Sequence, residues 1–293
     1  MKVPQFETKK EISAWLVANK ARLISLKKAE IKHCDGVTIE AAAQKVTASK
    51  ADLPQDTDDT IYRTIVGNTY NWMDSHTDVH IPGIFTKTIQ ETGDKVLHLH
   101  DHVYQLDAEV GDNLKVYEKE MSWRDLGVDK SGKTTALLMD TAIQRADNPS
   151  IFRKYANGRI QQHSVGMRYV KLFLAINDPE QKEEFATWQK YIDQVANKEV
   201  AEEIGYFWAV TEAKLIEISA VIRGSNEVTP TLDRKGLIEQ IKEADENTIK
   251  EILQLCKDME PGDHSETEPP DGTQEQKTNY FMLTLKNSEN ERV

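Results

Sequence analysis

The chain has 293 residues, a length typical of one or two domains. Its formal net charge of −12 argues against a general nucleic-acid binder or a protein of anionic membrane surfaces, because both need a basic face. Hydrophobic residues make up 39% of the chain, which suffices for one substantial core, and no apolar run is long enough to predict a transmembrane helix.

The compartment is predicted from the cysteines and the N-terminus. Cys34 and Cys256 lie far apart in the sequence and form no CxxC pair. We therefore expect two reduced thiols and a reducing cytoplasm. The first residues also lack the continuous apolar segment of a secretory signal.

The first 60 residues read as a separate N-terminal segment. Residues 8–32 are rich in Lys, Ala, Leu and Glu, with apolar side chains near helical spacing, and predict a helix. Residues 34–59 are small and polar with an acidic end, and we expect a flexible connector there.

A strand-rich region follows and runs to about residue 230. Alternating apolar and polar residues in VLHLH (96–100) and LKVYEKEM (114–121) predict strands. One helix is expected near 83–92, another strand over 134–143, and a short capped helix over 147–159, which begins with Asn-Pro and ends on a glycine.

The second half of this region contains the most strand-like sequence. Residues 159–176 are predicted to form a strand pair, and residues 205–210 and 213–223 return to strand character. Residues 178–203 lie between them and predict a helix with one apolar stripe. We expect this helix to be an insertion that lines or covers a substrate groove.

The chain ends in a third segment, residues 231–293. Apolar spacing after Pro230 predicts one or two amphipathic helices, and the acidic, low-complexity stretch from Met259 predicts disorder. The fold class expected for the whole is mostly β (α+β), with a core domain over 61–230 decorated by helices.

The stretch HLHDH (98–102) places three of the chain's eight histidines in five positions. One interpretation is a metal site, because histidines at alternate positions of a strand share a face and SHTDVH (75–80) adds similar ligands. Against it, three such histidines on a straight strand spread over roughly 13 Å. A second interpretation is inert strand residues, and a third is a catalytic base. The side chains concerned are His98, His100, His102, His76, Asp78 and His80.

The third interpretation needs a nucleophile, and QHSVGM (162–167) supplies Ser164. A serine hydroxyl becomes a nucleophile when an imidazole accepts its proton and a third group orients that imidazole. Gly166 would let the backbone come close to a substrate. His163 points away from Ser164 by strand alternation. A Ser-x-Gly pattern alone also fits an ordinary strand end.

Four segments, in order, resemble the prohead (capsid maturation) serine proteases of tailed bacteriophages, which are related to the herpesvirus assemblins. The resemblance covers about residues 61–230 and rests on the ordered set rather than on any single motif. The segments are SHTDVHIPGIFTKTI (75–89), HLHDHVYQLDAEVG (98–111), GRIQQHSVGM (158–167) and TEAKLIEISAVIRGSN (211–226).

The resemblance implies a role for individual residues. Ser164 matches the nucleophile, and His102 in LHDH matches the general base. His100 is the alternative base, because Asp101 follows it and imitates a His-Asp pair. The choice stays open because Gly111 follows His102 by nine residues, about two more than in the family's commoner pattern. Glu217 matches the acidic third member, with Glu212 as its alternative. His76, Asp78 and His80 match the opening segment and are expected to support the fold, with Asp78 capping a turn.

The resemblance further implies a closed or partly closed β-barrel core and a serine endopeptidase that needs no cofactor and no metal. Its expected substrates are the scaffold protein, the N-terminal region of the major capsid protein and the enzyme itself. It would act, self-associated, inside the prohead in the cytoplasm of an infected bacterium, without binding nucleic acid or membrane. Two alternatives remain: a metal-dependent hydrolase using the histidine-rich segments, and a catalytically silent assembly or scaffolding protein.

Overall fold

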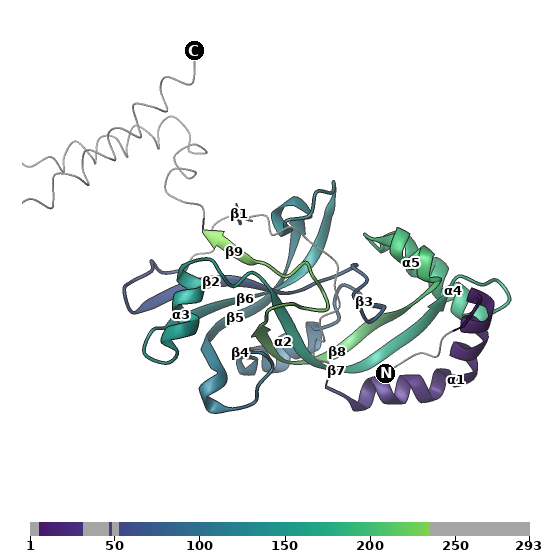
Figure 1. The fold of residues 1–293 in the computed structure, drawn as a ribbon, viewed down its shortest axis with the longest axis horizontal. Helices are drawn as coiled ribbons and strands as arrows, with labels where there is room; N and C mark the ends of the chain where they lie inside the picture. Colours follow the sequence, from purple (N-terminus) through teal and green to yellow (C-terminus); the bar gives the residue numbers. More distant parts are fainter. Residues whose placement is uncertain (1–5, 32–46, 49–52, 235–293) are drawn as a thin grey trace, which may run out of the picture. The chain divides into compact units, whose positions relative to one another are not determined.

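The computed structural model of the chain describes residues 6–31, 47–48 and 53–234, all within one compact unit, Met1–Gly236 (Figure 1). Most of the expected connector, both cysteines, the helices expected after Pro230 and the acidic tail lie outside the described residues. The expectations for those parts therefore stay predictions.

A nine-stranded sheet forms the body of the protein. Its hydrogen-bonded order is β1-β9-β2-β6-β5-β4-β8-β3, and β7 pairs with the other edge of β8. The pairs β1/β9, β3/β8 and β4/β8 are parallel and the others are antiparallel, so the sheet is mixed. The strands are β1 (Thr47–Ala48), β2 (Thr60–Thr69), β3 (Asp78–His80), β4 (Leu97–His100), β5 (Glu109–Ser122), β6 (Lys133–Gln144), β7 (His163–Ile176), β8 (Tyr206–Ala220) and β9 (Thr231–Arg234).

Strand pairing does not close this sheet into a barrel within the described residues. The segment before β9 nevertheless contacts both β2 and β7, which lie far apart in this strand order. Val66 N in β2 donates to the Pro230 carbonyl at 3.0 Å, and His163 N in β7 donates to the Thr229 carbonyl at 3.2 Å. The chain therefore has a mixed α/β fold with one large sheet flanked by helices.

Two of the helices that flank the sheet, α1 and α3, begin at capping signals in the sequence. In α1, the Thr8 side chain accepts from Glu11 N and the Glu11 side chain accepts from Thr8 N, a capping box. In α3, Asn148 caps the first turn and Pro149 follows it. The helices are α1 (Lys9–Ala29), α2 (Thr86–Thr92), α3 (Pro149–Ala156), α4 (Lys182–Tyr191) and α5 (Lys198–Ile204), with 3₁₀ turns at Gly93–Lys95, Leu106–Ala108, Arg124–Leu126 and Ile192–Gln194.

The longest hairpin corrects four expectations. Residues 163–176 form one strand rather than a pair, and its partner is β8, a single strand where two were expected. The predicted single helix over 178–203 is broken into α4, a 3₁₀ turn and α5. These helices connect the far ends of β7 and β8, where Ile176 pairs with Tyr206, whereas Ser164 pairs with Ser219 at the other end. The insertion therefore lies away from Ser164 and does not line a groove beside it.

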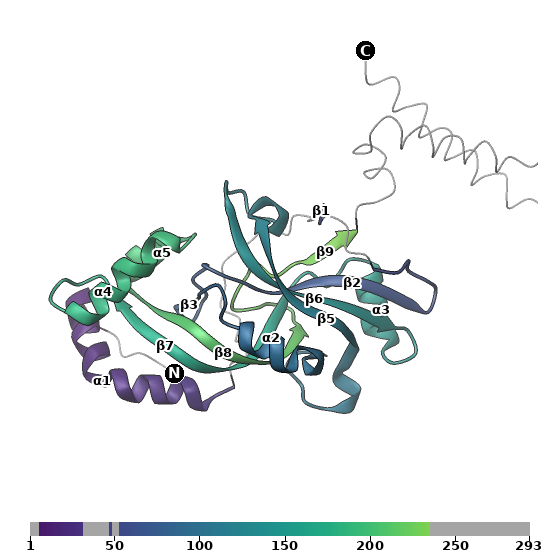
Figure 2. The same cartoon turned by 180° about the vertical axis from the view of Figure 1, so that it is seen from behind.

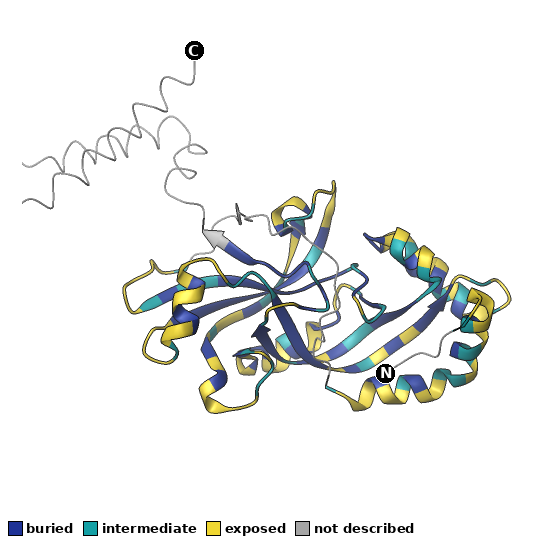
Figure 3. Cartoon of the chain, in the orientation of Figure 1, coloured by how far each residue is buried: buried dark blue, intermediate teal, exposed yellow. Residues whose placement is uncertain are grey.

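Helix α1 lies beside the β7–β8 hairpin in both views (Figures 1 and 2). Its inner face contributes Leu16 and Leu23 to the main hydrophobic core, while most of its outer face is exposed (Figure 3). Lys27, buried near the end of the helix, forms an ion pair with the completely buried Asp78 of β3. The N-terminal helix is thus packed into the same unit as the strands.

Candidate active site

The register of three strands brings Ser164, His102 and Glu217 to one end of the sheet. In the antiparallel pair β7/β8, Ser164 lies opposite Ser219 and Gly166 lies opposite Glu217. On the other edge of β8, Leu99 of β4 lies beside Ser219, and the chain turns shortly afterwards at His102. Three segments distant in sequence therefore meet around the last residues of β8.

Strand geometry places the side chains of Ser164, Ser219 and Glu217 on the same face. Directly opposite residues of an antiparallel pair share a face, with Cβ atoms about 4.5–5.5 Å apart. Residues two apart on one strand also share a face. Ser164 and Ser219 are an opposite pair, and Glu217 is two residues from Ser219.

The Glu217 carboxylate is the centre of a buried hydrogen-bond network. His102 Nδ1 lies 2.6 Å from Glu217 Oε1, and Ser219 Oγ donates to Glu217 Oε2 at 2.7 Å. Ser219 Oγ in turn accepts from the backbone N–H of His102 at 3.2 Å. Glu217 is completely buried and the His102 side chain is only 7% exposed, so the pair is shielded from water.

Gly166 provides the space for this carboxylate. A Cβ atom at position 166 would lie 2.0 Å from Glu217 Oε1, closer than any real contact. The expectation that Gly166 lets a substrate approach the backbone is therefore corrected, because the Glu217 side chain already lies over it.

The turn after β4 aims the His102 side chain at Glu217. Strand β4 ends at His100, and Asp101 and His102 both have left-handed backbone conformations, with φ of 52° and 57°. Asp101 N donates to the Ala220 carbonyl at 2.9 Å, which anchors the turn to β8. The expectation that the three histidines of HLHDH share one strand face is wrong, because His102 lies outside the strand. Left-handed non-glycine residues are uncommon and cluster at functional sites.

The two alternative residues lie outside the Glu217 network. His100 Nδ1 lies 3.0 Å from the carboxylate of its exposed neighbour Asp101, and strand alternation places His100 on the face opposite Ser219. Glu212 forms an ion pair with Lys171, and the hydrogen bond from that lysine lowers the pKa of Glu212.

The segment SHTDVH supports the fold, although one detail differs from the prediction. The turn is capped by Asp74, which accepts from the backbone N–H of His76 and of Asp78, and not by Asp78. Asp78 instead pairs with Lys27 and accepts from the Tyr169 hydroxyl at 2.7 Å. Among the described residues, no group of three or more His, Cys, Asp or Glu side chains is arranged to hold a metal ion.

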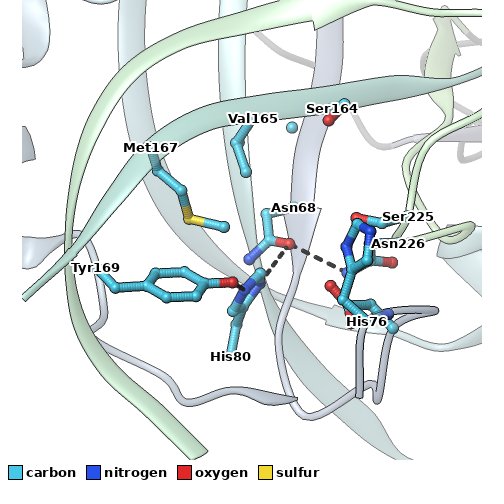
Figure 4. A pocket seen from close by; sticks show the side chains of 11 residues that line it. Asn68, His76, His80, Ser164, Val165, Met167, Tyr169, Ser225 and Asn226 are labelled. Atoms are coloured by element: carbon cyan, nitrogen blue, oxygen red, sulfur yellow. Dashed lines mark hydrogen bonds between the residues drawn. The ribbon is translucent and has the colours of Figure 1, made fainter. Parts of the chain in front are cut away.

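A pocket borders Ser164 on the other face of β7 (Figure 4). Val165, Met167 and Tyr169 extend into it, and Ser164 lies at its edge. Opposite them, Asn68 Oδ1 accepts from Asn226 Nδ2 at 3.1 Å and lies 3.0 Å from His80 Nδ1. Part of the wall beside the candidate nucleophile is therefore a fixed polar network.

Sequence reasoning missed two residues of the site. Ser219 lies within the quoted segment 211–226 but has no predicted role, although it joins Glu217 to the His102 backbone. Tyr104 lies near the network as well. Partial burial, and secondarily the negative charge of Glu217, raise its pKa to about 12, and Arg168 opposes this shift. Only its position two residues after His102 could have indicated it.

Comparison of the chain with protein-family models, with curated proteins and with solved structures finds no match. Among the described residues, no helix has both the length and the apolar character needed to cross a membrane.

Proposed function

We propose that this protein is a serine endopeptidase in which Ser164 is the nucleophile, His102 the general base and Glu217 the group that orients the base. The observation that carries the proposal is the buried hydrogen bond between His102 Nδ1 and Glu217 Oε1, on the sheet face that Ser164 shares. A carboxylate on one imidazole nitrogen fixes the tautomer in which the other nitrogen accepts a proton.

The reaction follows from these roles. Because Nδ1 donates to Glu217, His102 takes the Ser164 proton at Nε2 while Oγ attacks the carbonyl carbon of the peptide bond. The imidazolium then returns this proton to the leaving amine as the C–N bond breaks, which leaves an acyl-enzyme. Water, activated by the same imidazole, hydrolyses the ester and restores Ser164. Glu217 stabilises the imidazolium in both steps.

The biological setting is proposed from the resemblance to prohead proteases. The substrates would be scaffold protein, the N-terminal region of the major capsid protein and the chain itself, within a self-associated population inside the prohead in the host cytoplasm. We further propose that the segment before β9 partly closes the sheet into a barrel, since its Thr229 and Pro230 carbonyls accept from β7 and β2.

The test is co-expression with the capsid protein, followed by intact-mass spectrometry of both chains. Ser164→Ala should abolish all processing, because it removes the attacking hydroxyl and little else. Ser122→Ala is the matched control, since Ser122 lies at the end of β5, where its hydroxyl accepts from Asp125 N. Processing that continues in Ser164→Ala would overturn the proposal.

A further inference from the structure

A second pair of histidines lies on the sheet face opposite the Glu217 network. His98 in β4 and His163 in β7 are both completely buried. The hydroxyl of Tyr155 from α3 lies between them, 3.0 Å from His98 Nε2 and 2.9 Å from His163 Nε2. One phenolic oxygen thus joins the strand that leads to His102 with the strand that carries Ser164.

The donor and acceptor of each hydrogen bond can be assigned by starting from His163. Its Nδ1 lies 2.9 Å from the Thr229 carbonyl oxygen, which can only accept, so Nδ1 carries the hydrogen. Burial lowers the pKa of His163 to about 4, and the ring is neutral at neutral pH. Its Nε2 is therefore an acceptor, and the Tyr155 hydroxyl donates to it.

The same reasoning continues to His98. Since the Tyr155 hydrogen is directed at His163, the Tyr155 oxygen accepts from His98 Nε2–H. Burial lowers the pKa of His98 well below its ordinary value, so this ring is also neutral. Its Nδ1 then accepts from Thr141 Oγ1 at 3.0 Å. Only one arrangement of hydrogens satisfies the whole chain from Thr141 to Thr229.

The backbone of His163 is held as firmly as its ring. Its N–H donates to the Thr229 carbonyl, and Thr229 Oγ1 donates to the His163 carbonyl at 2.7 Å. A Cβ atom at Gly224 would lie 2.8 Å from that same carbonyl oxygen, so the following loop is packed against it. The residue that precedes Ser164 is therefore fixed on every side.

We propose that His98, Tyr155 and His163 form a positioning network that sets the place of Ser164 relative to His102. The inference rests on the proposed function. His163 is the direct neighbour of Ser164, and His98 stands four residues before His102 on the strand that ends in its turn. None of the three side chains lies on the sheet face of the Glu217 network. They therefore position Ser164 and His102 through the backbones of β7 and β4.

The kinetic test compares Tyr155→Phe with Tyr70→Phe. Tyr70 is also completely buried, and its hydroxyl donates to Glu118 Oε1 at 2.6 Å, away from the site. The readout is inactivation by a fluorophosphonate probe, with the maximal rate kinact separated from the half-saturation constant KI. Tyr155→Phe should lower kinact about tenfold with KI unchanged, since small misplacements of reacting groups cost this much. Tyr70→Phe should change neither, with urea unfolding showing both variants folded.

A spectroscopic test addresses the network without activity. In the Ser164→Ala chain, ¹⁵N NMR should show His163 with its hydrogen on Nδ1 and His98 with its hydrogen on Nε2. Other tautomers would overturn the network. An active wild type in which Tyr155→Phe reacts like Tyr70→Phe would overturn the positioning role alone. A wild type inert toward both probe and substrate would overturn the proposed function and the positioning role together, whatever the tautomers.

Discussion

His100, the last residue of β4, and His102, in the turn that follows, should respond differently to mutation. His102 reaches Glu217, whereas His100 lies on the other face beside an exposed aspartate. His102→Ala should abolish cleavage as completely as Ser164→Ala, because no base remains to take the proton. His100→Ala should retain most activity. A time course of self-cleavage at equal expression checks both variants, and the reverse ranking would make His100 the base.

Glu217 carries the second prediction for a single residue. Glu217→Gln keeps the size of the side chain but removes the charge that stabilises the imidazolium, and should lower the cleavage rate by roughly 10²–10⁴-fold. Glu212→Gln is the control and should leave the rate unchanged, since Glu212 pairs with Lys171 and lies outside the Glu217 network. Rate constants for both variants decide the matter, and a Glu217→Gln enzyme with the wild-type rate would exclude this role for the carboxylate.

Among the elements, α1 makes the clearest prediction. Lys27→Met leaves the carboxylate of Asp78 buried without its cation, and breaking a buried ion pair in this way costs about 3–5 kcal/mol. Lys10→Met removes an exposed ion pair with Glu180 and should not change stability measurably. Urea unfolding of the two variants gives the comparison. Equal free energies of unfolding would show that α1 is not held by this pair.

Helices and strands that are determined by nearby residues could be predicted from the sequence, and those that depend on distant contacts could not. Helix α1 was expected from its composition and from the helical spacing of its apolar side chains, and α3 from its Asn-Pro start. These signals are local in sequence. Strand β7 was expected as two strands, since its length says nothing about where its partner lies. The break between α4 and α5 depends on packing against the far ends of β7 and β8 and leaves no local mark.

The residues of the candidate site were predictable from local sequence, but their arrangement in space was not. Residue types and their order indicated Ser164, His102 and Glu217, which strand register then places around the end of β8. The ambiguity between His100 and His102 came from the spacing to Gly111, which is about two residues longer than in the family's commoner pattern. That spacing does not show that the chain leaves the strand after His100. The left-handed turn at Asp101 and His102 depends on hydrogen bonds to Ala220 and Ser219, which are distant in sequence.

For the whole molecule, buried histidines predict a loss of stability in mild acid. Burial lowers the pKa of His80, His98 and His163, the last to about 4. The unfolded chain therefore binds these protons more tightly, so their contribution is complete above about pH 6.5 and is lost as the pH falls toward 4. His163 alone accounts for about 3 kcal/mol. Asp74, whose pKa burial raises, opposes this trend.

Urea unfolding at several pH values between about 7.5 and 5 measures this effect. The free energy of unfolding should decrease steadily as the pH falls. A free energy that stays constant or increases over this range would contradict the assignment of three neutral, buried rings.

We propose above that His102 activates Ser164 as a nucleophile. The most direct test of this proposal is peptide mapping by mass spectrometry after reaction of the purified full chain with a fluorophosphonate. We expect one covalent adduct, on Ser164. This adduct should be absent from the His102→Ala chain and present in the His100→Ala chain. No adduct on the wild-type chain, an adduct on another residue, or equal labelling of Ser164 in His102→Ala would contradict it.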